Sequence, residues 1–178
     1  NVGGTGKTPI AMFLFKILNK MGYNPIFLTS GYKSKISKPC IANENVTLFG
    51  DEAIMLKNIG PTVVSKHKLK GVKYIETLNS KKRIYDIIVM DDGLQNYSIE
   101  KDLCFLTVDR KSLFGNEFCL PSGPLRQSFN SCIKNIDKII LTGNQNFEKG
   151  SNFLKKNILN SYIKVDNINS KNKFLAFS

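Results

Sequence analysis

The chain opens with NVGGTGKTP, residues 1–9, and this stretch decides the fold that we expect. Its three glycines let successive backbone N–H groups point into one concavity, which suits a phosphate group. Lys7 brings a cation to the terminal phosphates, and Thr8 offers a hydroxyl to Mg²⁺. We expect a helix over residues 10–21, whose positive end adds to the anion site. The opening predicts a phosphate-binding loop made of Asn1, Val2, Gly3, Gly4, Thr5, Gly6, Lys7 and Thr8.

The pattern departs from the usual GxxxxGKT motif at its first position, where Asn1 stands in place of glycine. A plain glycine turn before a helix is the competing interpretation, but GKT at the start of a helix is a specific signal. The strand that feeds such a loop would precede Asn1. We therefore expect that strand upstream of this sequence.

Length and composition indicate a single folded domain over residues 1–178. The 178 residues, 42% of them hydrophobic, are enough for one core. The longest uninterrupted apolar run, residues 10–15, is far shorter than the roughly 20 residues that a membrane-spanning helix needs. The four cysteines form no CxxC pair, and we expect them to be reduced thiols.

The charge balance favours anionic partners without choosing among them. Lys and Arg together number 26 against 14 Asp and Glu, which gives a net charge of +12. Because the excess is spread along the chain, a solvated lysine-rich surface explains most of it. No arginine-rich stripe or aromatic platform accompanies the charge, so we expect no nucleic-acid partner.

Short apolar runs alternate with helical patterns along the chain. The runs predicted as strands cover residues 25–29, 61–65, 85–90, 103–108 and 138–142. Helical spacing is present over residues 51–59, and a weak helix is predicted over residues 153–162. This alternation predicts a three-layer α/β fold with a mostly parallel sheet covered by helices on both faces, and the phosphate-binding loop at residues 1–8 makes it one of the P-loop NTPase type. In such sheets, ligands bind beyond the carboxyl ends of the strands.

Acidic residues lie at the ends of two of these elements. Asp91 and Asp92 end a predicted strand in MDDGLQ, where a carboxylate facing a phosphate loop can hold Mg²⁺; a strand-to-turn cap is the alternative. GDEA, residues 50–53, opens a predicted helix. Asp51 can orient or deprotonate an attacking hydroxyl there, and helix capping explains the motif equally well.

Three further residues have more than one interpretation. Arg126 in LPSGPLR suits a phosphate or carboxylate contact, or a structural ion pair. Tyr32 in SGYK suits stacking on a sugar, or support of a loop. His67, the single histidine, lies among lysines and is interpreted as a surface residue rather than a catalyst.

In this order, NVGGTGKTP, SGYK, GDEA, DDGLQ and LPSGPLR make the chain resemble the tetraacyldisaccharide 4′-kinases, the lipid A 4′-kinases. The resemblance implies transfer of the γ-phosphate of ATP, with Mg²⁺, to the 4′-hydroxyl of a tetraacylated glucosamine disaccharide 1-phosphate in lipid A biosynthesis. It also implies work at the cytoplasmic face of the bacterial inner membrane, with the acylated disaccharide lipid and the membrane surface as partners. A P-loop switch ATPase without a lipid acceptor is the alternative.

The resemblance also implies roles for individual residues. Asp51 would be the catalytic base, acting with Lys7. Glu52, Asp91 and Asp92 would serve the metal or the phosphates, together with Thr8. The residues expected to lie toward the substrate are Tyr32, Gln95, Asn96 and Arg126.

The chain departs from the family pattern at Ser30, Ala53, Asn96 and Gln127, where Arg, Pro, His and Glu are usual. Asn96 in place of histidine means that a titratable group is missing, and Ser30 in place of arginine means that a cation is missing. Family members also have a hydrophobic segment before the phosphate loop and a histidine near the C-terminus that partners the base. We therefore expect this sequence to be a kinase core cut at both ends, which by itself is soluble, binds nucleotide weakly and turns over poorly.

Overall fold

The structure of the chain is a computed structural model that describes residues 6–81, 84–111, 122–123, 134–143 and 158–161. Its contacts divide the chain into two compact units. The first unit is Lys7–Lys101, and the second combines Asn1–Gly6 with Asp102–Ser178. The expectation of a single domain over residues 1–178 stays a prediction.

The first unit is built on a four-stranded sheet in the order β2-β3-β1-β4. Strands β3 and β4 both pair with β1 in parallel, and β2 pairs with β3 antiparallel. The parallel strands therefore end at one edge, where their carboxyl ends lie side by side. The bounds are β1 (Pro25–Thr29), β2 (Cys40–Ile41), β3 (Thr62–Val64) and β4 (Ile87–Met90).

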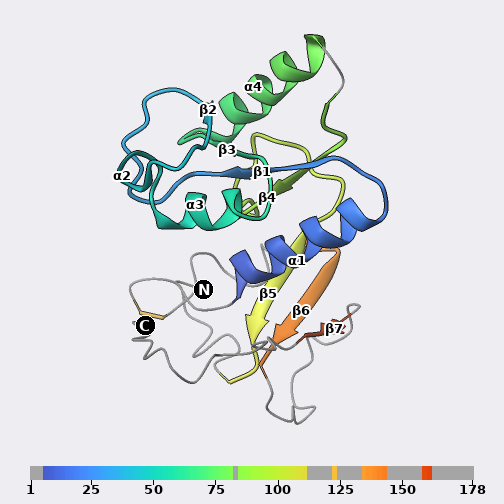
Figure 1. Ribbon diagram of the computed structural model, residues 1–178. Helices are drawn as coiled ribbons and strands as arrows, with labels where there is room; N and C mark the ends of the chain where they lie inside the picture. The colour runs from blue at the N-terminus through green and yellow to red at the C-terminus, as the bar shows by residue number, and fades with distance from the viewer. Residues whose placement is uncertain (1–5, 82–83, 112–121, 124–133, 144–157, 162–178) are drawn as a thin grey trace, which may run out of the picture. The chain divides into compact units, whose positions relative to one another are not determined.

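Helices cover both faces of this sheet, as the alternation of side chains along β1 requires. Phe27 packs in a cluster with residues of α1 (Lys7–Lys20) and α3 (Asp51–Lys57). Ile26 and Leu28 point the other way and pack with Ile75 of α4 (Lys68–Lys81). Figure 1 shows α1 and α3 on one side of β1 and α4 on the other. The predicted fold with a parallel-rich sheet and helices on both faces is confirmed.

Helix α1 is held on the sheet by an aromatic contact. Phe15 stacks on Phe27 with ring centroids 4.3 Å apart. Gly60 permits this packing, because a Cβ at that position would lie 2.1 Å from the Phe15 ring. The helix ends at Lys20, and Gly22 beyond it has a φ of +89°, which lets Tyr23 N donate to Leu18 O at 3.1 Å in a Schellman motif.

The second unit contains a parallel three-stranded sheet in the order β5-β6-β7. Its strands are β5 (Phe105–Asp109), β6 (Lys138–Thr142) and β7 (Ile158–Asn160). The helix predicted over residues 153–162 is wrong at 158–160, because these residues pair with Ile139–Leu141 of β6. The other predicted residues of that helix lie outside the described part of the chain, apart from Ser161.

Most predicted elements are present with shifted ends. Strands β1 and β6 match residues 25–29 and 138–142, whereas α1 begins at Lys7, three residues before the predicted start. Three elements had no counterpart among the predictions: β2, α4 and the short helix α2 (Val46–Phe49). Within the described residues, no helix combines the length and the apolar character needed to cross a membrane.

Candidate active site

The GKT motif lies at the start of α1. Gly6 has a φ of +77°, which glycine adopts without strain, and Lys7 and Thr8 are the first two residues of the helix. The predicted loop residues Asn1, Val2, Gly3, Gly4 and Thr5 lie outside the described residues. The described part of the motif therefore places its cation and its hydroxyl at the amino end of a 14-residue helix.

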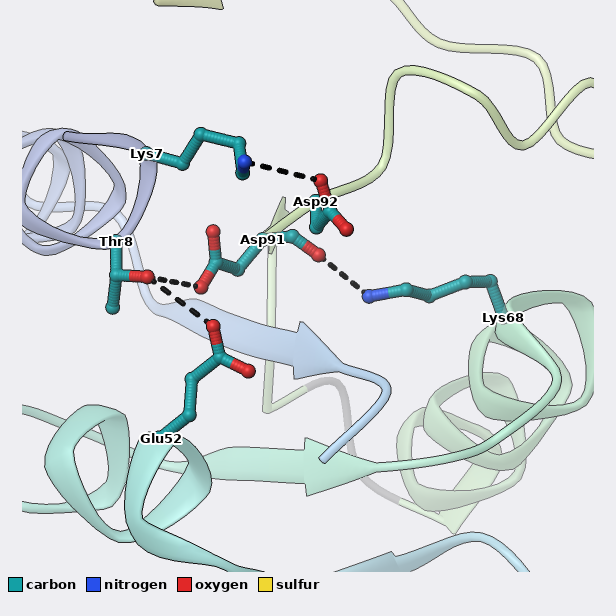
Figure 2. Close-up of polar contacts among 6 residues, drawn as sticks. All are labelled: Lys7, Thr8, Glu52, Lys68, Asp91 and Asp92. Carbon is teal, nitrogen blue, oxygen red and sulfur yellow. Dashed lines mark hydrogen bonds and ion pairs between the residues drawn. The ribbon is translucent and has the colours of Figure 1, made fainter. Parts of the chain in front are cut away.

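The Thr8 hydroxyl joins two carboxylates from distant parts of the chain. Its Oγ1 lies 2.9 Å from Oδ2 of Asp91 and 3.3 Å from Oε1 of Glu52 (Figure 2). A hydroxyl has one proton to donate, so it cannot satisfy both carboxylates fully. The three side chains thus form a cluster rich in oxygen acceptors, which suits a shared proton or a cation.

The two carboxyls in this cluster are shifted toward the protonated form. Asp91 is 2% exposed, and burial raises its pKa, although the Thr8 hydroxyl and the positive charge of Lys68 act in the opposite direction. Burial, followed by the negative charge of Asp91, raises the pKa of Glu52. The negative charge of these two carboxylates is only partly offset by their neighbours. Together with the hydroxyl, they supply the oxygen donors that Mg²⁺ prefers.

The oxygen atoms of Thr8, Asp91 and Glu52 are of the type that binds magnesium. Mg²⁺ in phosphate-transfer sites is held by one or two carboxylates together with waters and substrate phosphates. Over the described ranges, no group of three or more His, Cys, Asp or Glu side chains has the geometry of a complete metal cage. Thr8, Asp91 and Glu52 supply one hydroxyl and two carboxylates, which are donors of the kind found in such sites.

The second aspartate faces the lysine of the GKT motif. Lys7 Nζ lies 3.8 Å from Oδ1 of Asp92, and both side chains are about one third exposed (Figure 2). Asp92 has a φ of +51°, a left-handed conformation that aspartate adopts more readily than most residues. Neighbouring residues Asp91 and Asp92 thus differ: the first is buried beside Thr8, and the second reaches Lys7 at the surface.

Lys68 is a site residue that the sequence did not reveal. The residue is 5% exposed, and its Nζ donates to the backbone carbonyls of Asp91, at 2.6 Å, and Leu28, at 3.1 Å. Burial lowers its pKa to about 8, against the influence of nearby carboxylates. It is one of three lysines in SKHKLKG, and burial cannot be read from such a stretch. The one available signal is its place shortly after a strand end.

His67, the residue before Lys68, is exposed, as expected.

Two glycines bring the SGYK and GDEA motifs together. Gly50 has a φ of +81°, and a Cβ there would lie 2.5 Å from the carbonyl oxygen of Tyr32. Gly31 has a φ of +63°, and a Cβ there would lie 2.4 Å from Val64 of β3. The start of α3 therefore packs directly against the loop that carries Tyr32. The Tyr32 side chain itself is 73% exposed.

The loop after β4 is fixed by its own polar groups. Asn96 Oδ1 accepts from Ser98 N at 3.2 Å and from Ser98 Oγ at 2.6 Å. Lys101 Nζ donates to the Asn96 carbonyl at 2.5 Å. Gln95 is exposed on this loop. The carbonyl oxygen of the Asn96 side chain is thus engaged within the loop, which leaves its amide group for other contacts.

The structure brings together residues of three predicted motifs. Asp51 is exposed at the first position of α3, next to Glu52 in the chain. Arg126 lies outside the described residues. The predicted residues that hydrogen bonds and an ion pair bring together are Lys7, Thr8, Glu52, Asp91 and Asp92.

Comparisons with known proteins agree with these motifs. The family model described as LpxK, tetraacyldisaccharide-1-P 4′-kinase, matches residues 1–174. A tetraacyldisaccharide 4′-kinase of Rickettsia canadensis is 34% identical over 100% of this chain and 55% of its own length. The enzyme of the same name from Francisella philomiragia is 36% identical over 93% of this chain and 53% of its own length.

A solved structure matches as well. The crystal structure of "apo" form LpxK from Aquifex aeolicus in complex with ATP has a TM-score of 0.72 and 27% identity, covering 89% of this chain and 50% of that one. The chain thus spans about half the length of the relatives it matches. On the breadth of the family match and the identity to its members, the chain belongs to the LpxK family of tetraacyldisaccharide-1-P 4′-kinases.

Proposed function

We propose that this chain is the core of a kinase that transfers the γ-phosphate of ATP to the 4′-hydroxyl of a tetraacyldisaccharide 1-phosphate. One observation carries the proposal: the cation and hydroxyl of the GKT motif lie within 4 Å of carboxylates from two other motifs of the first unit. Family membership supports the reaction class. The ATP complex of the Aquifex aeolicus relative supports the choice of nucleotide.

The phosphate side is assigned to Lys7, Thr8 and the amino end of α1. The free N–H groups of the first helical turn and the Lys7 ammonium attract the β- and γ-phosphates. ATP would draw Lys7 away from Asp92, because a polyphosphate carries more charge than one partly exposed carboxylate. Thr8, Asp91 and Glu52 would hold Mg²⁺, which neutralises phosphate charge when bound.

The acceptor side is assigned to exposed residues of the first unit. Asp51 would accept the proton of the attacking hydroxyl, and its exposure at the start of α3 leaves it open to a substrate. Tyr32 and Gln95 are exposed and would contact the sugar, and the side-chain amide of Asn96 is assigned to the same substrate. Arg126 is proposed to bind a phosphate through its planar fork.

The lipid acceptor and its location are further parts of the proposal. The net charge of +12 attracts both ATP and an anionic lipid headgroup. We place the chain at the cytoplasmic face of the inner membrane, where an acylated disaccharide is presented at the surface. Nothing in the charge pattern favours a nucleic-acid substrate.

The direct test is transfer of a labelled phosphate. ATP labelled in the γ-phosphate is incubated with the chain, Mg²⁺ and a tetraacylated glucosamine disaccharide 1-phosphate, and the lipid is extracted. Label on the lipid at the 4′-position supports the kinase. Label released only as free phosphate favours the alternative, a P-loop switch ATPase. A Lys16→Ala variant, on the exposed face of α1, serves as the matched control.

A further inference from the structure

Lys68 occupies a buried place at the carboxyl edge of the first unit's sheet. Its Nζ donates to the carbonyl of Leu28 in β1 at 3.1 Å and to the carbonyl of Asp91 at 2.6 Å. Asp91 directly follows β4, which is the neighbour of β1 in the sheet. One ammonium therefore bridges the ends of two adjacent parallel strands.

These contacts hold Asp91 from two directions. The Asp91 N–H donates to Leu28 O at 3.1 Å, so the ammonium and this amide share one acceptor. On its side-chain end, Asp91 Oδ2 accepts from Thr8. Figure 2 shows Lys68 reaching the backbone of Asp91 while Thr8 reaches the carboxylate. The backbone of Asp91 is thus fixed independently of its carboxylate.

The start of α4 is built to bring Lys68 close to the strands. A Cβ at Gly71 would lie 2.5 Å from Leu28 Cδ1 and 3.0 Å from Ser65 Cβ, so only glycine lets the helix approach this closely. Ser65 Oγ donates to the carbonyl of His67 at 2.7 Å and fixes the turn before the helix. The position of the ammonium therefore follows from the backbone path of this segment.

A direct phosphate ligand would need donors that face solvent. Lys68 is 5% exposed, and two of its three N–H donors are used by carbonyl oxygens. Its charge also lies near the carboxylates of Asp91, Asp92 and Glu52, which it partly offsets. The contact that reaches the site therefore runs through the backbone of Asp91.

We propose that Lys68 is a positioning residue that sets the Asp91 carboxylate for the divalent cation bound with the nucleotide. This proposal rests on the proposed function, in which Asp91 is a ligand of Mg²⁺. It adds a residue that touches neither nucleotide nor acceptor and acts by fixing the peptide between β4 and the following turn.

The test compares Lys68→Met with Lys70→Met, an exposed lysine on the same helix turn, in the full chain. Isothermal titration with ATP is run with and without Mg²⁺. We expect Lys68→Met to weaken Mg²⁺-dependent ATP affinity about 10- to 100-fold, the range for residues that orient metal ligands, with Mg²⁺-free affinity nearly unchanged. Equal losses with and without Mg²⁺, or affinities equal to those of Lys70→Met, overturn the proposal.

A second readout does not depend on nucleotide. Hydrogen exchange of the Asp91 amide, followed by NMR, is expected to be about tenfold faster in Lys68→Met, with exchange in α1 unchanged. If wild type fails to bind Mg²⁺–ATP, the proposed function fails, and this exchange still decides the role of Lys68. Unchanged exchange at Asp91 overturns it. Should Lys68→Met not fold, Lys68→Gln keeps a neutral amide group as donor, and the same changes are expected to be smaller in this variant.

Discussion

The buried and exposed halves of the site differ in how firmly the fold holds them. Thr8, Glu52, Asp91 and Lys68 are at least half-buried and linked by hydrogen bonds at the carboxyl edge of the sheet. The residues proposed for the acceptor, Asp51, Tyr32 and Gln95, are exposed. The buried half is therefore fixed by the same packing that stabilises the fold, whereas the exposed half can be changed without disturbing it.

The buried half also lowers the stability of the fold. A pKa of Lys68 lowered from 10.5 to about 8 corresponds to about 3 kcal/mol of stability lost at neutral pH, at about 1.4 kcal/mol per pKa unit. A buried cation that weakens the fold is expected where its position serves another purpose, and here it lies at the backbone of Asp91.

The largest expected effect is that of Lys7→Ala. Removing a cation from the phosphates should reduce phosphate transfer by on the order of 100- to 1,000-fold, because charge stabilisation at the phosphates is lost. The free energy of unfolding should change little, since Lys7 is partly exposed. Rates are measured with labelled ATP and stability by urea unfolding. Lys16→Ala should match wild type in both, and an equal drop in both variants would contradict the assignment.

The two aspartates are expected to differ in how strongly their substitution weakens Mg²⁺-dependent ATP affinity. Asp91→Asn should weaken Mg²⁺-dependent ATP affinity by about 100-fold, since a buried ligand is neutralised beside Thr8. Asp92→Asn should weaken it by about tenfold or less, because a partly exposed ion pair contributes little. Isothermal titration measures both. Equal effects would show that burial does not distinguish the two residues.

A smaller effect is expected in the exposed half. Tyr32→Ala should lower kcat/KM for the lipid acceptor by about tenfold through loss of a stacking contact, with ATP affinity and melting temperature unchanged. Initial rates at varied acceptor concentration, with ATP saturating, test this. Tyr97→Ala, another exposed tyrosine, is the matched control. A loss of ATP affinity in Tyr32→Ala would contradict the assignment of this residue to the exposed half of the site.

The smallest effect is a dependence of stability on pH. Glu52 and Asp91 have pKa values raised above their ordinary 4.5 and 3.8, so the folded state binds protons more tightly than the unfolded state. Their contribution to the free energy of unfolding is fully present below about pH 4 and is lost as pH rises through the raised values. Lys68, with a pKa of about 8, stays charged over this range.

Without Mg²⁺, wild type should therefore lose stability relative to Glu52→Gln as the pH rises from about 4 through the raised pKa of Glu52. Urea unfolding over this range measures the difference, with Glu76→Gln, an exposed glutamate of α4, as control. A difference that grows in the opposite direction would mean that the pKa of Glu52 is lowered in the folded protein.

The sequence predicted the elements whose pattern is local and strong. The run PIFLT is apolar and bounded by turn residues, and it forms β1 with every residue buried. The GKT, GDEA and DDGLQ motifs carry residue types that serve few purposes together, so their meeting at one site was predictable. Parallel pairing then brought them to one edge of the sheet.

The missed features depend on tertiary contacts. Helix α4 has the sequence KLKGVKYIETLNSK, in which many lysines and Gly71 hide the apolar positions. The burial of Lys68 follows from the close approach that Gly71 permits, and no local pattern carries that information. Residues 158–160 form a strand only because β6 offers a parallel partner, which outweighs the local helical spacing.

The central claim is that the hydroxyl of α1 and the acid at the tip of β4 serve one magnesium–triphosphate site. A double-mutant cycle with Thr8→Ala and Asp91→Asn, measured as Mg²⁺–ATP affinity by isothermal titration, tests this most directly. We predict that the effects are not additive, with an interaction energy of about 1 kcal/mol or more. Additive losses, with each residue acting as if the other were absent, would contradict a shared site.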